Sequence, residues 1–173
     1  LLVNGAGGGS GAFLLQLAKA AGMHVTGVDN AGKLDFMRLM GADETIDYRE
    51  QDFTRTGPYD LVIDLVAYRS VFAYRRALAP GGRCFVVGGT TRVLIRMLTV
   101  GALVGLVSGT RLGALTVPTG PARFEPLAAR CAAGEIQVPI DAEYNLVHTR
   151  EALEHHGNGR ALGKVVVRIR DDP

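Results

Sequence analysis

The chain has 173 residues, of which 47% are hydrophobic, and its 19 Lys and Arg nearly balance 17 Asp and Glu, leaving a formal charge of +2. This length suits one well-buried α/β domain with an appendage, and the composition argues against disorder and collagen-like repeats. The balanced charge, with no basic stretch interleaved with aromatic residues, argues against a nucleic-acid partner.

Short apolar runs alternate with helical stretches along the chain, the pattern of a parallel sheet with crossover helices. The run Tyr59–Ala67 is apolar on both faces, as a central parallel strand is. Six strands with helices between them predict an α/β protein with a doubly wound parallel six-stranded Rossmann-type sheet. In chain order we expect strand Leu1–Asn4, helix Ser10–Ala21, strand His24–Val28, helix Lys33–Met40, strands Thr45–Tyr48 and Tyr59–Ala67, helix Val71–Ala79, strand Arg83–Val87, a helix from Val93, strand Ala114–Val117, helix Ala122–Ala133, strand Ile136–Asp141, helix Arg150–His156 and strand Lys164–Ile169.

Two further features concern the surroundings of the protein. The most membrane-like run, Val93–Val107, is shorter than the roughly 20 residues that a span requires and carries Arg96, so we expect a partly buried helix. Cys84 and Cys131 are isolated and form no CxxC motif, which is typical of idle thiols in a reducing compartment. With no basic N-terminal signal visible, we expect a cytoplasmic protein without a membrane partner.

A glycine-rich turn directly follows the first predicted strand, and an A-x-G-x-x-G spacing places Ala6, Gly8 and Gly11 before the first helix. In a dinucleotide-binding turn the first position allows a tight bend, the second admits a pyrophosphate, and the third lets the helix pack closely on the strand. The helix N-terminus offers free N–H groups and a partial positive charge to the anion. The flanking strand and helix favour dinucleotide binding over a purely structural turn.

The end of the second strand supplies a carboxylate, Asp29, eighteen residues beyond Gly11. An acid at this point of a Rossmann fold accepts hydrogen bonds from ribose hydroxyls, and Asn30 beside it is a second candidate contact. The alternative interpretation of Asp29 is a solvated loop acid. No G-x-x-x-x-G-K-[ST] sequence occurs, so no P-loop competes with this interpretation.

Five stretches together resemble the medium-chain dehydrogenase/reductase superfamily, and most closely its zinc-less quinone-oxidoreductase-like branch. They are "VNGAGGGSGAFLLQLAKAAGMHVTGV", "GADETIDYREQDF", "YDLVIDLVAYRS", "RRALAPGGRCFVVGG" and "GRALGKVVVRI", in the family's order along nearly the whole chain. The resemblance implies that residues 1–135 form the Rossmann cofactor domain and residues 136–173 the returning segment of a GroES-like catalytic domain. The first part of that domain has no counterpart here, so we expect a fragment of a longer protein.

The resemblance also implies cofactor contacts beyond the turn and Asp29. Ala67 stands where the family has glycine, a departure that bears on close backbone contact with the cofactor. Lys33, Tyr48 and Arg160 match positions that contact an adenosine 2′-phosphate in some members; the alternatives are two solvated charges and a half-buried tyrosine. The implied pyrophosphate turn is Ala6, Gly8, Gly9, Ser10 and Gly11, and the further contacts are Val66 and Ala67 after the fourth strand and Gly88 and Gly89 after the fifth.

Cofactor choice rests on two opposing features. Asp29 favours NAD(H), because a carboxylate accepts hydrogen bonds from the ribose diol and repels a 2′-phosphate. Lys33, Tyr48 and Arg160 favour NADP(H), because charge-assisted hydrogen bonds from two of them outweigh one repulsion. Lys33 follows Asp29 by four residues and is placed to pair with it. We therefore favour NADP(H), with NAD(H) as the alternative.

These features predict the cofactor-binding domain of an NAD(P)H-dependent oxidoreductase that transfers hydride to a small carbonyl, enone or quinone, or in the reverse direction from an alcohol. The alternatives are a non-catalytic dinucleotide-sensing Rossmann module and a methyltransferase with a similar turn. We assign no catalytic residue, and Asp64 is expected to be structural or near the cofactor. His24, His148, His155 and His156 form no ligand set, so no metal site is assigned. The family implies a homodimer, which we expect through Ala114–Val117 with help from Val93–Val107.

Overall fold

The structure, a computed structural model, describes residues 1–116 and 120–170. Its main body is a six-stranded sheet in the order β3-β2-β1-β4-β5-β6, with every neighbouring pair parallel. The predicted α/β fold with a doubly wound Rossmann-type sheet is thus confirmed. The strands are β1 (Leu2–Asn4), β2 (Thr26–Asp29), β3 (Glu44–Asp47), β4 (Tyr59–Asp64), β5 (Leu78–Val86), β6 (Arg111–Ala114), β7 (Ile140–Asn145) and β8 (Lys164–Arg168).

Helices cover the sheet from both sides, and each side has its own hydrophobic core. On one side α1 and α2 bury Leu15 and Met37. On the other, α3 and the long helix after β5 bury Tyr74 and Met97. The helices are α1 (Gly9–Ala20), α2 (Leu34–Leu39), α3 (Val71–Ala77), α4 (Thr91–Arg96), the π-helical η3 (Met97–Gly101), α5 (Ala102–Ser108), α6 (Pro121–Ala132) and α7 (Thr149–Gly157), with 3₁₀ turns η1 (Ala31–Lys33), η2 (Phe53–Arg55) and η4 (Leu146–His148).

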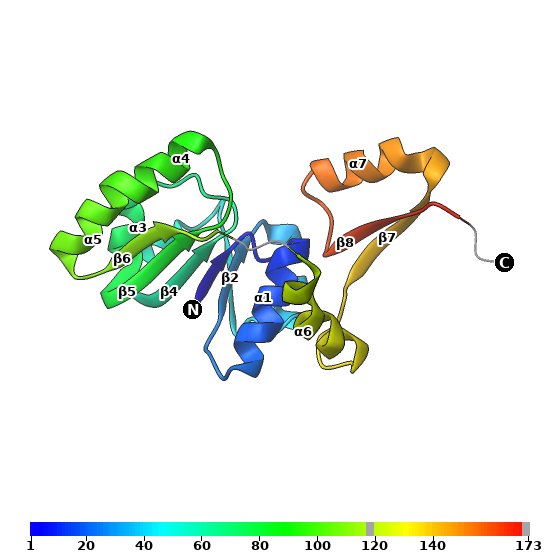
Figure 1. Cartoon of the computed structure of the whole chain (residues 1–173), viewed down its shortest axis with the longest axis horizontal. Helices are drawn as coiled ribbons and strands as arrows, with labels where there is room; N and C mark the ends of the chain where they lie inside the picture. Colours follow the sequence, from blue (N-terminus) through cyan, green and yellow to red (C-terminus); the bar gives the residue numbers. More distant parts are fainter. Residues whose placement is uncertain (117–119, 171–173) are drawn as a thin grey trace.

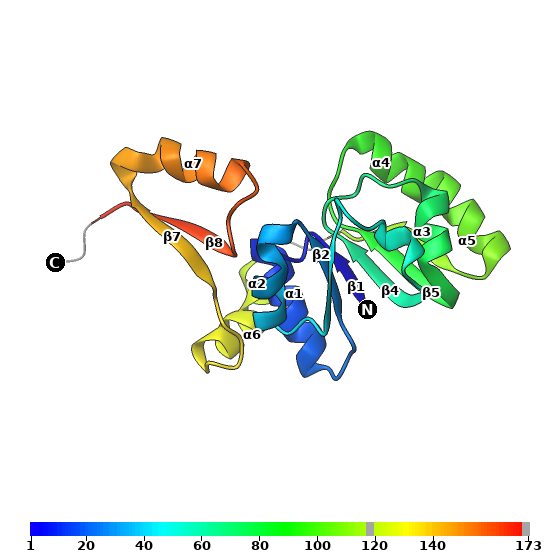
Figure 2. The ribbon, with the colours of Figure 1, turned by 180° about the vertical axis from the view of Figure 1, so that it is seen from behind.

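The second sheet consists of two parallel strands, β7 and β8, joined by α7. It lies at the opposite end of the molecule from β5 and β6, with α1 and α6 between (Figures 1 and 2). An isolated bridge between Gly8 and Gly163 connects it to the glycine turn of the main sheet. Gln16 of α1 adds hydrogen bonds to the backbone of Gln137 at 3.0 and 2.8 Å. The last part of the chain therefore returns to the start of α1.

The segments α4, η3 and α5 follow one another without interruption from Thr91 to Ser108, longer than the predicted Val93–Val107 helix. Only 17% of this stretch is buried, so it is more exposed than we expected. Among the described residues it is the one helix long and apolar enough to cross a membrane, which by itself is weak grounds for a membrane location. The exposed surface of this helix is largely apolar and includes Leu103, Leu106 and Val107.

The sixth strand was misplaced by sequence reasoning. The prediction was Ala114–Val117, whereas β6 is Arg111–Ala114 and shares only Ala114 with it; Val117 lies outside the described residues. Leu112, 5% exposed, pairs with Cys84 of β5 and fixes the register. β6 ends the sheet and has one strand neighbour, so the apolar pattern from Ala114 onward was a weak guide.

Three other strands differ from their predictions, and one of them, β5, begins at Leu78 rather than at the predicted Arg83. The strand predicted at Ile136–Asp141 is β7, Ile140–Asn145, because Pro139 has no N–H for a strand ladder and Ile136 is buried instead, 2% exposed. The predicted strand Tyr59–Ala67 ends at Asp64. The Asp64 side chain accepts hydrogen bonds from the backbone N–H groups of Val66 and Ala67, which therefore leave the strand ladder. Within β4 burial alternates between Val62 and its neighbours, so only one face is fully covered.

Candidate functional site

The glycine turn between β1 and α1 has two positions with opposite steric surroundings. A Cβ atom on Gly11 would lie 2.4 Å from the carbonyl oxygen of Ala6 and 2.5 Å from that of Gly5, so only glycine lets α1 approach the strand. A Cβ on Gly8 would meet nothing closer than 3.6 Å. Gly8, which also forms an isolated bridge with Gly163, is therefore less crowded than Gly11 at the helix N-terminus, where the spacing argument requires room for an anion.

The N-terminus of α1 carries no side-chain cap and no acidic residue in its first turn. The first N–H groups of an α-helix lack partners within the helix and carry a partial positive charge. With Gly8 as the N-cap residue, these donors receive no side-chain hydrogen bond from the cap. The turn therefore leaves a helix end of the kind that binds anions, and anion binding by Ala6, Gly8 and Gly11 stays a prediction.

Asp29, the last residue of β2, points its carboxylate at the glycine turn. Its Oδ2 accepts a hydrogen bond from the N–H of Gly7 at 3.0 Å. Its Oδ1 accepts the backbone and side-chain N–H groups of Asn30 at 2.9 and 3.1 Å. The side chain is 13% exposed, and the Lys33 ammonium lies 4.0 Å from Oδ1. Asp29 is thus a partly buried carboxylate rather than a solvated loop acid.

Lys33 is buried against the turn, with only 8% of its side chain exposed. A Cβ on Gly7 would lie 2.5 Å from the Lys33 Cδ, so the lysine packs directly over Gly7. The Asn30 side chain accepts the Gly32 N–H at 3.1 Å and begins the 3₁₀ turn that brings Lys33 back. Burying a lysine is costly unless an anion faces it, and Asp29 supplies part of that charge.

A cavity of about 320 Å³ opens beside this group, at the carboxyl ends of β1 to β4. Ligands of open parallel sheets bind at this edge, where the strand order reverses between β1 and β4. Five predicted site residues come together here, namely Asp29, Asn30, Lys33, Tyr48 and Val66. Sequence reasoning missed the other lining residues, which are Asn4, Gly5, Tyr68 and Gly159.

The missed residues had weak signals in the sequence. Tyr68 directly follows the predicted pair Val66–Ala67, is 51% exposed, and carries the Arg69 guanidinium 4.8 Å from its ring centroid. Gly159 comes from the segment after α7, next to the predicted Arg160. Arg160 itself is exposed and does not line the cavity, whereas its neighbour does.

The loop after β4 contains a left-handed residue. Ala67 has φ +59° and is 2% exposed, which explains structurally why glycine suits this position in the related family. Gly88 and Gly89 after β5 also have positive φ, and a Cβ on Gly89 would come 3.1 Å from that of Ala67. The two predicted turns therefore pack against each other at Ala67 and Gly89.

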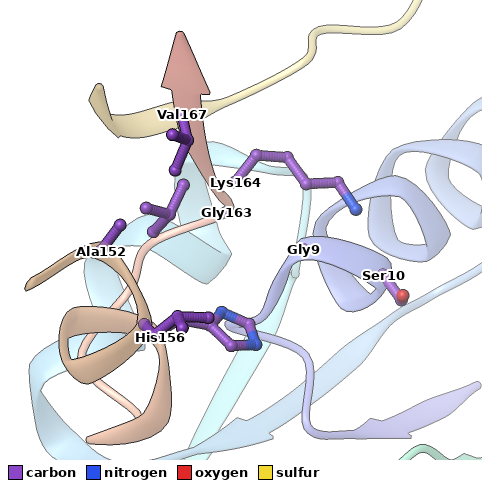
Figure 3. A pocket seen from close by; sticks show the side chains of 9 residues that line it. Gly9, Ser10, Ala152, His156, Gly163, Lys164 and Val167 are labelled. Atoms are coloured by element: carbon purple, nitrogen blue, oxygen red, sulfur yellow. The ribbon is translucent and has the colours of Figure 1, made fainter. Parts of the chain in front are cut away.

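The remaining turn residues, Gly9 and Ser10, line a different cavity of about 350 Å³ between α1 and the second sheet. Figure 3 shows Lys164 and His156 on the opposite walls of this cavity. A Cβ on Gly9 would lie 3.0 Å from the Gly163 carbonyl oxygen and from the Lys164 side chain. Gly9 thus serves the contact between the returning chain and α1.

The described residues offer no metal-ligand cluster, and two titratable side chains of the core, Asp64 and Cys84, are buried. No three His, Cys, Asp or Glu side chains among those residues lie close enough to hold a metal ion. Asp64, expected to be structural or near the cofactor, is fully buried and hydrogen-bonded behind the cavity. Burial and the nearby Asp64 raise the pKa of the Cys84 thiol, so this cysteine stays protonated and unreactive.

The sheet order, the glycine turn and the cavity at the switch point define a Rossmann domain of the dinucleotide-binding class. A family model described as zinc-binding dehydrogenase matches residues 40–167. The chain belongs to this family, within the medium-chain dehydrogenase/reductase superfamily that the sequence resembles.

Curated relatives and a solved structure agree with this assignment. The chain is 28% identical over 172 residues to quinone-oxidoreductase QR1, chloroplastic, of Triphysaria versicolor, covering 96% of this chain and 51% of that protein. It is 27% identical to the mitochondrial NAD(P)H oxidoreductase RTN4IP1 of Bos taurus, with coverages of 98% and 48%. The quinone oxidoreductase from Coxiella burnetii superposes with a TM-score of 0.82 at 25% identity, covering 98% of this chain and 52% of that one. The chain spans about half the length of these relatives.

Proposed function

We propose that this chain is the NAD(P)H-binding half of an oxidoreductase that transfers hydride to a small carbonyl, enone or quinone. The observation that carries the proposal is the glycine turn beside the cavity at the switch point. Its Gly11 has no room for a Cβ atom against the backbone, whereas its Gly8 has that room. The relatives named quinone oxidoreductase and NAD(P)H oxidoreductase support the reaction class.

The turn and the helix end are suited to the cofactor's pyrophosphate. Backbone N–H groups at the start of α1 donate to phosphate oxygens, and the open side of Gly8 lets them approach. The cavity between Asp29, Tyr48 and Tyr68 then receives the adenosine. Val66 lies on the same wall, on the β4 side, where the resemblance implies the nicotinamide half.

The surroundings of Asp29 support the preference for NADP(H). Its oxygens already accept hydrogen bonds from the Gly7 N–H and from Asn30, and the Lys33 ammonium 4.0 Å away partly compensates the negative charge before a ligand arrives. Lys33 and Tyr48 line the same cavity and offer an ammonium and a hydroxyl to a 2′-phosphate. Arg160 is a third donor only if its exposed side chain turns towards the cavity next to Gly159.

Hydride chemistry belongs to the nicotinamide, and the chain contributes binding and orientation. None of the described residues around the cavity is a histidine or an unpaired acid suited to give a proton to substrate. Zinc, which the family name implies, finds no ligand group among them either. We expect the proton and the substrate contacts to come from the part of the protein outside this chain.

We propose that residues 136–173 are the returning segment of the substrate domain. Two parallel strands with one helix are too small to be stable alone, and this unit exposes apolar side chains. Its continuation into a larger sheet would cover them. The exposed apolar side chains are Val138, Ile140, Leu146, Val147 and Leu153.

We also propose a homodimer through the outer edge of β6 and the adjoining helix from Thr91 to Ser108. Among the described residues β6 has one strand neighbour, so its other edge offers backbone groups that no strand of these residues pairs with. The helix packs against β6 and exposes Leu103, Leu106 and Val107 at 65, 82 and 89%. An apolar face of this kind beside an open strand edge favours self-association.

A fluorescence titration of the chain with NADPH and NADH tests the cofactor proposal. Gly8→Ala is expected to fold normally, because its Cβ has ordinary contacts, yet to weaken binding at least about tenfold by blocking the pyrophosphate. Gly157→Ala, where a Cβ meets nothing within 4 Å, is the matched control and should bind like wild type. Unchanged affinity in Gly8→Ala, or a wild type that binds neither cofactor, contradicts the proposal.

A further inference from the structure

Asp64, the last residue of β4, holds a fully buried carboxylate without a cation. None of the ion pairs formed within residues 1–116 and 120–170 includes it. Its Oδ1 accepts the backbone N–H groups of Val66 and Ala67, each at 2.8 Å. A buried charge of this kind persists only because hydrogen-bond donors surround it.

The same oxygen also reaches the neighbouring strand. Asn4 of β1 is the register partner of Asp64, and its side-chain N–H donates to Oδ1 at 2.8 Å. Asn4 and Val66 both line the 320 Å³ cavity. One carboxylate oxygen therefore fixes two wall residues of the cavity and the left-handed turn at Ala67, although Asp64 is itself absent from the wall.

The second carboxylate oxygen of Asp64, Oδ2, accepts a hydrogen bond from the protein core and not from the cavity wall. Tyr74 of α3 is fully buried and donates its hydroxyl to Oδ2 at 2.7 Å. Burial and the neighbouring Asp64 charge raise the pKa of Tyr74, so the hydroxyl remains a donor. Tyr74 does not line the cavity. The carboxylate thus has a cavity side, through Val66, Ala67 and Asn4, and a core side, through Tyr74.

We propose that Asp64 is a positioning residue for the cofactor, acting through the Val66–Ala67 turn and Asn4. The inference rests on the proposed function, because the cavity is taken as the NAD(P)H site. Its physical basis is the conformation of Ala67, which an L-residue seldom adopts without support. Without the Asp64 bonds this turn relaxes, and Val66 leaves the position at which it meets the ligand.

Two substitutions on the two sides of the carboxylate separate positioning from general stability. Asp64→Asn keeps the volume but replaces charge-assisted bonds to the turn with weaker neutral ones, and is expected to raise the NADPH Kd about fivefold. Tyr74→Phe removes one bond on the core side and is expected to lower the thermal midpoint while leaving Kd within about twofold of wild type. Both are titrated at a temperature at which circular dichroism reports a folded chain.

A rescue variant tests the route through Ala67. Glycine reaches a positive φ without support, so Ala67→Gly in the Asp64→Asn background should return Kd to within about twofold of Ala67→Gly alone. Equal Kd in wild type and Asp64→Asn, or an equal loss in Tyr74→Phe, overturns the inference while NADPH binding by wild type upholds the proposed function. A wild type that binds neither cofactor overturns both.

Discussion

The backbone N–H of Gly7 donates to Oδ2 of Asp29 at 3.0 Å, so the carboxylate that ends β2 braces the glycine turn that follows β1. In an NAD(H) site such a carboxylate accepts hydrogen bonds from the ribose hydroxyls. Here it already holds the turn and Asn30, and the Lys33 ammonium stands 4.0 Å away. The residue that favours NAD(H) in the sequence is thus partly neutralised in the fold.

Lys33 is therefore expected to decide cofactor preference. Lys33→Ala removes the cation next to a 2′-phosphate and should raise the Kd for NADPH about tenfold or more, with little change for NADH. Fluorescence titration with both reduced cofactors measures this difference. Lys19→Ala, an exposed lysine of α1 paired with Asp43, is the control for a lost positive charge. An equal loss of both cofactors, or tighter NADH binding by wild type, contradicts the preference.

Gly11 is expected to be indispensable for folding rather than for binding. In Gly11→Ala the new Cβ meets main-chain oxygens at 2.4 and 2.5 Å, and neither β1 nor α1 can move without disturbing the core around Leu15. We expect a loss of about 3 kcal/mol in the free energy of unfolding, measured by urea denaturation. Gly157→Ala should be nearly neutral. A Gly11→Ala chain as stable as wild type would show that the turn adapts more than its contacts indicate.

The fold was largely predictable because its signals are local. The strands β1 to β3 and helix α1 were predicted within two residues, since apolar runs and glycine stops lie within each element. β6 was placed three residues too late, because an edge strand is fixed by one partner, here through Leu112 and Cys84, rather than by its own pattern. β7 also begins four residues later than predicted, and a long-range contact sets its start: the Lys164 N–H donates to the Pro139 carbonyl at 2.8 Å.

The candidate site was predictable only where sequence spacing encodes it. Ala6, Gly8, Gly11 and Asp29 follow a spacing imposed by one βαβ unit. Gly7 was missed because its need for glycine comes from Lys33, which packs on it in three dimensions. Tyr68 and Gly159 were missed because the cavity gathers them from separate loops. Asp64 carried no motif, and its role is visible only in the donors around it.

Acid should destabilise the chain partly through Asp43. Hydrogen bonds from the Lys19 ammonium and from the Val25 N–H hold the pKa of Asp43 below its usual value. A carboxylate whose pKa is lower in the folded than in the unfolded chain stabilises the fold at a pH above its unfolded-state pKa of about 3.9. This stabilisation is lost as the pH falls through its folded-state pKa. Asp43→Asn should therefore show a smaller fall in thermal midpoint between pH 6 and pH 3 than wild type does. The exposed Asp35→Asn is the control, and an unchanged fall in Asp43→Asn would contradict the assignment.

The isolated chain is expected to bind NADPH without oxidising it. Its described residues form the proposed cofactor cavity, but no histidine, unpaired acid or metal ligand group is among those that line it. Hydride transfer needs the substrate held against the nicotinamide, and the relatives that carry out such reactions are about twice as long. Absorbance at the reduced-nicotinamide band, followed with a panel of quinones and enones, measures turnover. NADPH binding in the same preparation is the positive control, and robust turnover would place substrate-binding groups within this chain.

The chain is expected to form a dimer in dilute buffer, because the helix from Thr91 to Ser108 leaves its apolar face open next to the β6 edge. Light scattering at tens of micromolar should give twice the chain mass. Replacing Leu103 and Leu106 together by lysine puts two charges on that face and should yield a monomer with an unchanged far-ultraviolet spectrum. Leu153→Lys, at an equally exposed leucine of α7, should leave the dimer intact. A monomeric wild type would contradict the dimer, and a dimer that survives the double substitution but is lost in Leu153→Lys would place the interface at α7 and not at β6.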